Sequence, residues 1–162
     1  MKSLKILAAA LLLAGSLAGP ALADTASDDT SVRALMMQTF DRPDSPLKVD
    51  PITVDGDIAV AGWSQGDMGG RALLRRKDGH WVLVLCSGDA LKDPKGLQTF
   101  GLPEEQAKAL AIAIVAAEAK LDAALVAKFS TFDGVVTMGE DGQHPPAAGH
   151  DGHDQHSGGY GG

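Results

Sequence analysis

The stretch LKVDPITVDGDIAVAGWSQGDMGGRALLRRKDGHWVLVLC (residues 47–86) decides the fold of this 162-residue chain. It contains Asp55-Gly56 and Asp78-Gly79, dipeptides that favour two-residue hairpin turns between strands. Between them, residues 66–70 (Gly-Asp-Met-Gly-Gly) are typical of a third turn. The stretch therefore predicts an antiparallel meander of four strands, at about residues 48–54, 57–65, 70–77 and 80–86.

A helical pattern precedes the strands. Apolar residues recur at helical spacing from Val32 to Phe40, after Thr30 or Ser31 as a capping residue. The polar residues 24–30 carry no such pattern and are expected to form a loose arm.

A second helical region follows the strands. Pro103 suits the first turn of a helix that continues to about Leu121, and Leu125, Phe129 and Phe132 recur at helical spacing. Residues 134–138 look like a last short strand. A helix, a meander and further helices predict an α+β domain, with N- and C-terminal helices packed against the sheet.

The first 23 residues have the pattern of a secretory signal peptide. Lys2 and Lys5 precede an apolar run, Ile6–Leu13, that is too short to span a bilayer, and Ala21-Leu22-Ala23 suits a signal peptidase. We therefore expect export from the cytoplasm and cleavage after residue 23, which would leave 139 of the 162 residues. An uncleaved anchor is the less favoured alternative.

The last 24 residues, 139–162, have a composition unlike the rest. Eight of them are glycine, and none is an aliphatic residue larger than alanine. Such a segment cannot bury enough apolar surface to offset its chain entropy, so we expect it to be disordered. The predicted organisation is a signal peptide (1–23), an α+β domain (24–138) and a tail (139–162).

Charge and cysteine content exclude some classes of partner and an internal disulfide. The chain has 14 basic and 21 acidic residues, a net charge of −7, which becomes −9 once Lys2 and Lys5 are removed. This balance argues against nucleic acid and against an anionic membrane as partners. The single cysteine, Cys86, cannot form an internal disulfide, and burial is the most common fate of a lone cysteine.

Four of the five histidines lie in the tail, at His144, His150, His153 and His156. The last three form a His-x-x-His-x-x-His pattern among glycines, so one flexible chain could supply several imidazoles to one ion. Imidazole binds copper, zinc and nickel, and nitrogen-rich sites hold Cu(II) most tightly among the divalent first-row ions. The pattern predicts copper binding, with zinc or nickel possible. The alternative is a solubilising tail that binds metal only incidentally.

Softer ligands occur in the predicted domain. The thiol of Cys86 and the thioether of Met68 would suit Cu(I), and a Met68–Cys86 pair is geometrically open because each lies near a strand end. Cys86 and His80 are expected on one face of a strand but about 20 Å apart, too far to share an ion. Met36 lies on the apolar face of its helix, which favours core packing.

The sequence also contains features of two further classes of function, catalysis and binding of an apolar ligand. Cys86-Ser87-Gly88-Asp89 could be a nucleophile at a strand end, but no histidine of the predicted domain lies close enough to act as its base, so catalysis is not expected. A curved sheet backed by helices could instead enclose an apolar pocket. The aromatic residues that could line such a pocket, or simply fill the core, are Trp63, Trp81, Phe100, Phe129 and Phe132.

Several motifs together resemble one family. They are Phe-Asp-Arg-Pro at 40–43, the run AVAGWSQGDMGGRALLR at 59–75, Gly-His-Trp at 79–81, Leu-Cys-Ser-Gly-Asp at 85–89 and the stretch 129–138. The chain resembles the small exported proteins of Gram-negative bacteria called copper uptake system-associated proteins. The resemblance implies association with periplasmic copper-handling components, such as a copper chaperone or an outer-membrane copper receptor. It carries no ligand set over to this chain.

Pattern and resemblance lead to one hypothesis. The chain is expected to be a periplasmic copper-binding accessory protein whose tail captures Cu(II) for uptake or delivery. The alternative is a module that binds a non-metal ligand or a protein and has an incidental tail.

Overall fold

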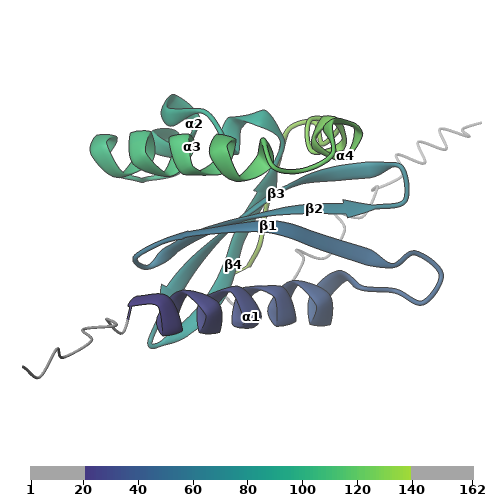
Figure 1. The fold of residues 1–162 in the computed structure, drawn as a ribbon, viewed down its shortest axis with the longest axis horizontal. Helices are drawn as coiled ribbons and strands as arrows, with labels where there is room; N and C mark the ends of the chain where they lie inside the picture. The colour runs from purple at the N-terminus through teal and green to yellow at the C-terminus, as the bar shows by residue number, and fades with distance from the viewer. Residues whose placement is uncertain (1–20, 140–162) are drawn as a thin grey trace, which may run out of the picture.

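The computed structural model describes residues 21–139. A five-stranded antiparallel sheet lies between two helical layers, with the N-terminal helix on one face and the three helices that follow the meander on the other (Figure 1). The elements in chain order are α1 (Ala21–Phe40), β1 (Leu47–Asp55), β2 (Ile58–Gln65), β3 (Met68–Lys77), β4 (His80–Ser87), a 3₁₀ turn (Asp89–Leu91), α2 (Pro94–Thr99), α3 (Glu104–Glu118), α4 (Ala123–Lys128) and β5 (Val135–Thr137). The predicted α+β class, the meander and the last short strand are confirmed.

The strands follow one another in space as they do in sequence, from β1 to β5. Two of the turns contain the predicted Asp-Gly pairs, with positive φ angles of 59° at Gly56 and 80° at Gly79. Glycine adopts this conformation without steric cost, which explains why these dipeptides close the hairpins.

The sheet buries side chains on both faces. Val32 and Met36 of α1 pack on one face against residues such as Ala61 and Leu83, while the other face packs on α2 and α3 through residues such as Leu110. Because both faces are covered, β2 and β3 are buried along most of their length instead of alternating between apolar and polar residues.

The structure corrects the prediction of a loose arm at residues 24–30. These residues belong to α1, which begins at Ala21. The carboxylate of Asp28 accepts a hydrogen bond from Trp81 Nε1 at 3.2 Å and pairs with Arg76 at 2.6 Å. Polar contacts to the sheet hold this part of the helix. The prediction relied on the spacing of apolar residues, which carries no information about polar contacts.

The third turn is shorter than predicted. Strand β3 begins at Met68, and the turn is confined to Gly66 and Asp67. Gly69 and Gly70 lie inside the strand, where a methyl group on either would come within 3 Å of a neighbouring atom. These glycines permit close packing and do not form the turn.

The C-terminal helical region also differs in detail. The sequence did not predict α2, although Asp93-Pro94 is a good helix start, and the Asp93 side chain accepts a hydrogen bond from the Gly96 amide at 3.1 Å. Phe132 lies in the loop after α4 and not on a helix. Within residues 21–139, no helix has both the length and the hydrophobicity to cross a bilayer.

Candidate functional site

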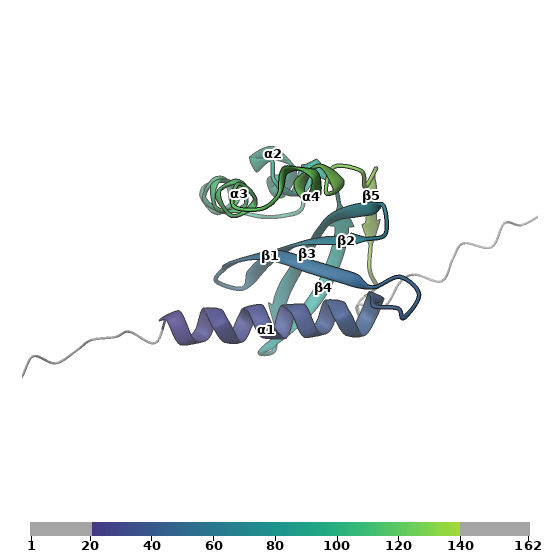
Figure 2. The ribbon, with the colours of Figure 1, turned by 45° about the vertical axis from the view of Figure 1, so that its right-hand side comes forward.

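A cavity of about 230 Å³ opens on the α1 side of the sheet, where α1 ends beside β2, β4 and β5. Figure 2 shows β5 running along the sheet edge toward the C-terminal end of α1. We call this 230 Å³ space the α1-side cavity. Its lining residues are Phe40, Arg42, Leu47, Trp63, Gln65, Cys86, Phe132, Val136 and Met138. All of them except Leu47 come from four of the motifs on which the family resemblance is based, so segments far apart in sequence meet here.

Hydrogen bonds fix the turn that forms one rim of the cavity. Gln65 Nε2 donates to the carbonyl oxygens of Phe40 and Ser45, at 2.9 and 2.7 Å. Asp41 Oδ1 accepts from the Leu47 amide at 2.8 Å. The segment between α1 and β1 is therefore held against β2, and Arg42 is held at the cavity.

The floor of the cavity is aromatic. Trp63 and Phe132 meet edge to face, with ring centroids 5.6 Å apart and an interplanar angle of 78°. This arrangement is favourable for aromatic quadrupoles. The Trp63 ring reaches over β3 because its neighbour there is Gly70, whose Cα has no side chain to obstruct it.

Two hydrogen-bond donors of the cavity-lining residues have no acceptor in the part of the protein that the structure describes. Trp63 Nε1 is buried and has no hydrogen-bond partner among the described residues. The exposed guanidinium of Arg42 forms no ion pair within residues 21–139. A buried donor without an acceptor is rare in folded proteins, so this end of the molecule has unused hydrogen-bonding capacity.

Cys86 lies in the cavity wall, as a buried thiol near the end of β4. Burial raises the pKa of this thiol to about 12. Its Cα partner on β5 is Val136, and Met138 follows two residues later on the same side of the sheet. The two sulfur-containing side chains of this cavity are therefore those of Cys86 and Met138.

Met68, the other predicted soft ligand, lies elsewhere. It is the first residue of β3 and is 53% exposed, whereas Cys86 pairs with Ala72, four residues further along that strand. Four residues of strand span about 13 Å. The structure therefore does not bring Met68 and Cys86 together.

His80 is also placed differently from the prediction. The register of β3 and β4 shifts between Leu73 and Leu74, and this irregularity puts Cys86 on the same face as Trp81. Since His80 precedes Trp81, strand alternation puts His80 on the opposite face from Cys86. The prediction of a shared face was wrong, because no sequence signal indicated the bulge in β4.

The predicted histidine ligands His144, His150, His153 and His156 lie outside the described residues, as do residues 1–20 of the predicted signal peptide. Within the described part of the chain, no group of three or more His, Cys, Asp and Glu side chains is placed to hold a metal ion.

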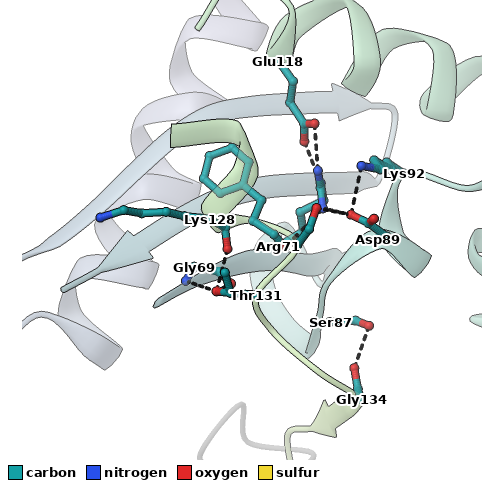
Figure 3. A network of polar contacts seen from close by, with 11 residues as sticks. Gly69, Arg71, Ser87, Asp89, Lys92, Glu118, Lys128, Thr131 and Gly134 are labelled. Carbon is teal, nitrogen blue, oxygen red and sulfur yellow. Dashed lines mark hydrogen bonds and ion pairs between the residues drawn. The ribbon is translucent and has the colours of Figure 1, made fainter. Parts of the chain in front are cut away.

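A second polar cluster lies on the opposite face of the sheet (Figure 3). Arg71 of β3 is fully buried and donates to Glu118 from Nε and Nη2, at 2.6 and 2.8 Å. Its Nη1 pairs with Asp89 at 3.1 Å, and its guanidinium lies over the Phe129 ring, 5.5 Å from the centroid. This fork of charge-assisted bonds ties the sheet to the ends of α3 and α4.

Asp89 of the Cys86-Ser87-Gly88-Asp89 motif belongs to this cluster. A hydrogen bond from Ser130, with support from Lys92 and Arg71, lowers the pKa of its carboxyl group. All three neighbours contact the same oxygen, Oδ1. Figure 3 shows Asp89 directed toward Arg71 and Lys92. These ion pairs give Asp89 a structural role.

Of the predicted pocket aromatics, the structure brings Trp63 and Phe132 to the cavity. Phe129 is fully buried beside Arg71, and Trp81 packs beneath Arg76 on the sheet. Sequence reasoning missed Arg42 and Gln65 as site residues. Their only signal was membership of the motifs at 40–43 and 59–75.

We expect Cys86 to react slowly with a maleimide in the folded protein. A pKa raised from 9.0 to about 12 lowers the thiolate fraction near neutral pH about a thousandfold, and the thiolate is the reactive form. The native labelling rate should still be rising above pH 9, whereas the rate in denaturant should level off there. A native rate that levels off near pH 9 would contradict this, and rapid native labelling that Cu(I) blocks would make Cys86 a metal ligand.

Comparison of the chain with protein-family models, with curated proteins and with solved structures finds no match in any of the three.

Proposed function

We propose that this chain is an exported, periplasmic copper-binding accessory protein in which His144, His150, His153 and His156 capture Cu(II). The His-x-x-His-x-x-His pattern carries the proposal, because it concentrates three imidazoles, good copper ligands, in the seven residues 150–156. The resemblance to copper uptake system-associated proteins supports copper over zinc or nickel.

The position of β5 supports a role in delivery. Met138 follows β5 directly and lines the α1-side cavity, and His144 is six residues further along the chain. Six residues reach at most about 20 Å. An ion held at His144 would therefore stay near the domain that a copper chaperone or an outer-membrane receptor would recognise.

The proposed role is binding and not catalysis. Asp89, the acidic residue nearest to Cys86 in the motif, is engaged by Arg71, Lys92 and Ser130. The buried, protonated thiol of Cys86 is a weak nucleophile unless a base activates it. Release of copper would need only competition for the imidazoles.

The test is copper per chain after dialysis against excess Cu(II). We expect the intact protein to retain copper, and H150A/H153A/H156A and a chain ending at Gly139 to lose most of it, because a chelate weakens steeply as its ligands are removed. His80→Ala is the matched control, since His80 is the one histidine of the described residues and is expected to contribute nothing.

Equal, near-stoichiometric copper in all four proteins would overturn the proposal and place the site in the folded domain. Retention should also fall below about pH 6.5, where protons compete for imidazole. Copper retained unchanged at pH 5 would show that other groups hold the ion.

The second candidate function is a module that binds a non-metal ligand. The α1-side cavity favours it, because a concave apolar site with a few polar groups is the usual form of a small-molecule site.

A further inference from the structure

The α1-side cavity has two kinds of surface. Apolar walls would suit the apolar part of a ligand, and hydrogen-bond donors would suit a polar group on the same ligand. Its walls are mostly apolar, from residues such as Leu47, Phe132, Val136 and Met138. Its free polar groups are donors. Gln65 also lines the cavity, but its Nε2 already donates to two backbone carbonyl groups. The remaining donors are therefore Trp63 Nε1 and the guanidinium of Arg42.

Trp63 Nε1 requires an explanation that the described residues do not provide. A buried N–H without an acceptor loses its hydrogen bond to water and gains none in return. The other tryptophan, Trp81, avoids this loss, because its Nε1 donates to Asp28 at 3.2 Å. Nε1 is itself sealed from the cavity, so an acceptor on a ligand could reach it only through a movement of the Trp63 ring.

Arg42 specifies the charge of that acceptor. Arg42 lines the cavity, and its guanidinium forms no ion pair in the described part of the chain. The guanidinium group matches the two oxygens of a carboxylate. Because the whole chain is acidic, with a net charge of −7, selection of an anion here must come from these local groups.

The volume limits the size of the ligand. A cavity of about 230 Å³ holds about eight groups of the size of a water molecule, at about 30 Å³ each. This corresponds to a carboxylate with a short aliphatic tail. We propose that the α1-side cavity binds a small aliphatic carboxylate, with the tail against the aromatic floor and the carboxylate at Arg42.

A soft metal ion is the competing occupant, since Cys86 and Met138 both line the cavity. Two features disfavour it. Arg42 brings a positive charge to the cavity, which repels a metal ion, and burial keeps the thiol protonated. This proposal is independent of copper capture by the C-terminal histidines.

The test uses hexanoate, with eight non-hydrogen atoms, and its neutral isostere hexanamide, both titrated in EDTA so that no metal contributes. The readout is the indole ¹H–¹⁵N signal of Trp63, assigned with Trp81→Phe. We expect hexanoate to shift this signal saturably with about millimolar affinity, as suits so small a ligand. Hexanamide should bind about tenfold more weakly, because it lacks the charge-assisted bond.

Arg42→Gln is the decisive variant, because Arg42 is exposed and its loss should leave the fold intact. It should remove the preference for hexanoate over hexanamide, while Lys48→Gln, an exposed lysine on the adjacent strand, should retain it. No saturable shift with hexanoate, equal affinity for the two compounds, or a preference that survives Arg42→Gln would each overturn the proposal. A shift produced by Cu(I) but not by hexanoate would identify the metal as occupant instead. Copper retention by the tail is measured separately, so either proposal can fail alone.

Discussion

Glu118→Ala should reduce the free energy of unfolding by about 3–5 kcal/mol, the cost typical of removing one partner of a buried ion pair. Arg71 is fully buried, and Glu118 accepts two of its hydrogen bonds, at 2.6 and 2.8 Å. Without Glu118, the charged partner left to Arg71 is Asp89, whose side chain is 57% exposed. Solvent screens that pair, so it compensates only part of the loss. Urea unfolding followed by circular dichroism would measure the change.

Glu105→Ala is the matched control on the same helix. Glu105 is exposed and pairs with Lys108 at 3.1 Å, so its removal should cost less than about 0.5 kcal/mol. The double variant R71L/E118L should recover much of the stability, because removing both charges leaves none buried and unpaired. If Glu118→Ala and Glu105→Ala were equally mild, Glu118 would not be the anchor that the geometry indicates.

This ion pair also explains why an acidic residue, Glu118, occupies the last turn of α3. Glu118 lies in the last turn of α3, where the helix dipole disfavours an acidic side chain. Arg71 supplies the compensating charge from β3. Because the two residues are 47 positions apart, no local pattern could have paired them.

The hairpins were predictable from the sequence because their signals are local. Asp-Gly pairs at 55–56 and 78–79 determine the turn geometry by themselves, whatever the rest of the chain does. Glycines further from a turn were ambiguous. Gly69 and Gly70 looked like part of a turn, but they lie in β3 because other segments pack closely against them.

The candidate site was only partly predictable, because its residues meet through contacts between distant parts of the chain. Cys86, Trp63 and Phe132 were candidates by residue type, and the structure places all three at the α1-side cavity. Arg42 and Gln65 reach it through the turn after α1, which Gln65 itself holds. That position depends on contacts across the sheet, so the sequence indicated the residue types but not the place where they meet.

Gly70→Ala should destabilise the protein by about 2–3 kcal/mol, although simple propensity predicts the opposite sign. Gly70 has no positive φ angle, and replacing such a glycine by alanine usually stabilises by about 0.4–1 kcal/mol. Here a methyl group would lie 2.9 Å from Phe132 Cβ, 3.0 Å from Trp63 Cζ2 and 3.1 Å from the Ser87 oxygen. Overpacking of this kind costs about 1–3 kcal/mol, and two of the three neighbouring atoms belong to or adjoin the backbone and cannot easily move.

Gly56→Ala separates this steric effect from backbone strain. A methyl group at Gly56 would have no atom within 4 Å, but its φ angle of 59° makes alanine unfavourable by about 1 kcal/mol. Both variants should therefore be less stable in urea, but only Gly70→Ala should change the near-ultraviolet circular dichroism, because it displaces the Trp63 ring. It should also shift the Trp63 indole signal without any ligand. An unchanged Trp63 signal together with increased stability would show that the ring yields at little cost, and that Gly70 is not needed to form the floor of the cavity.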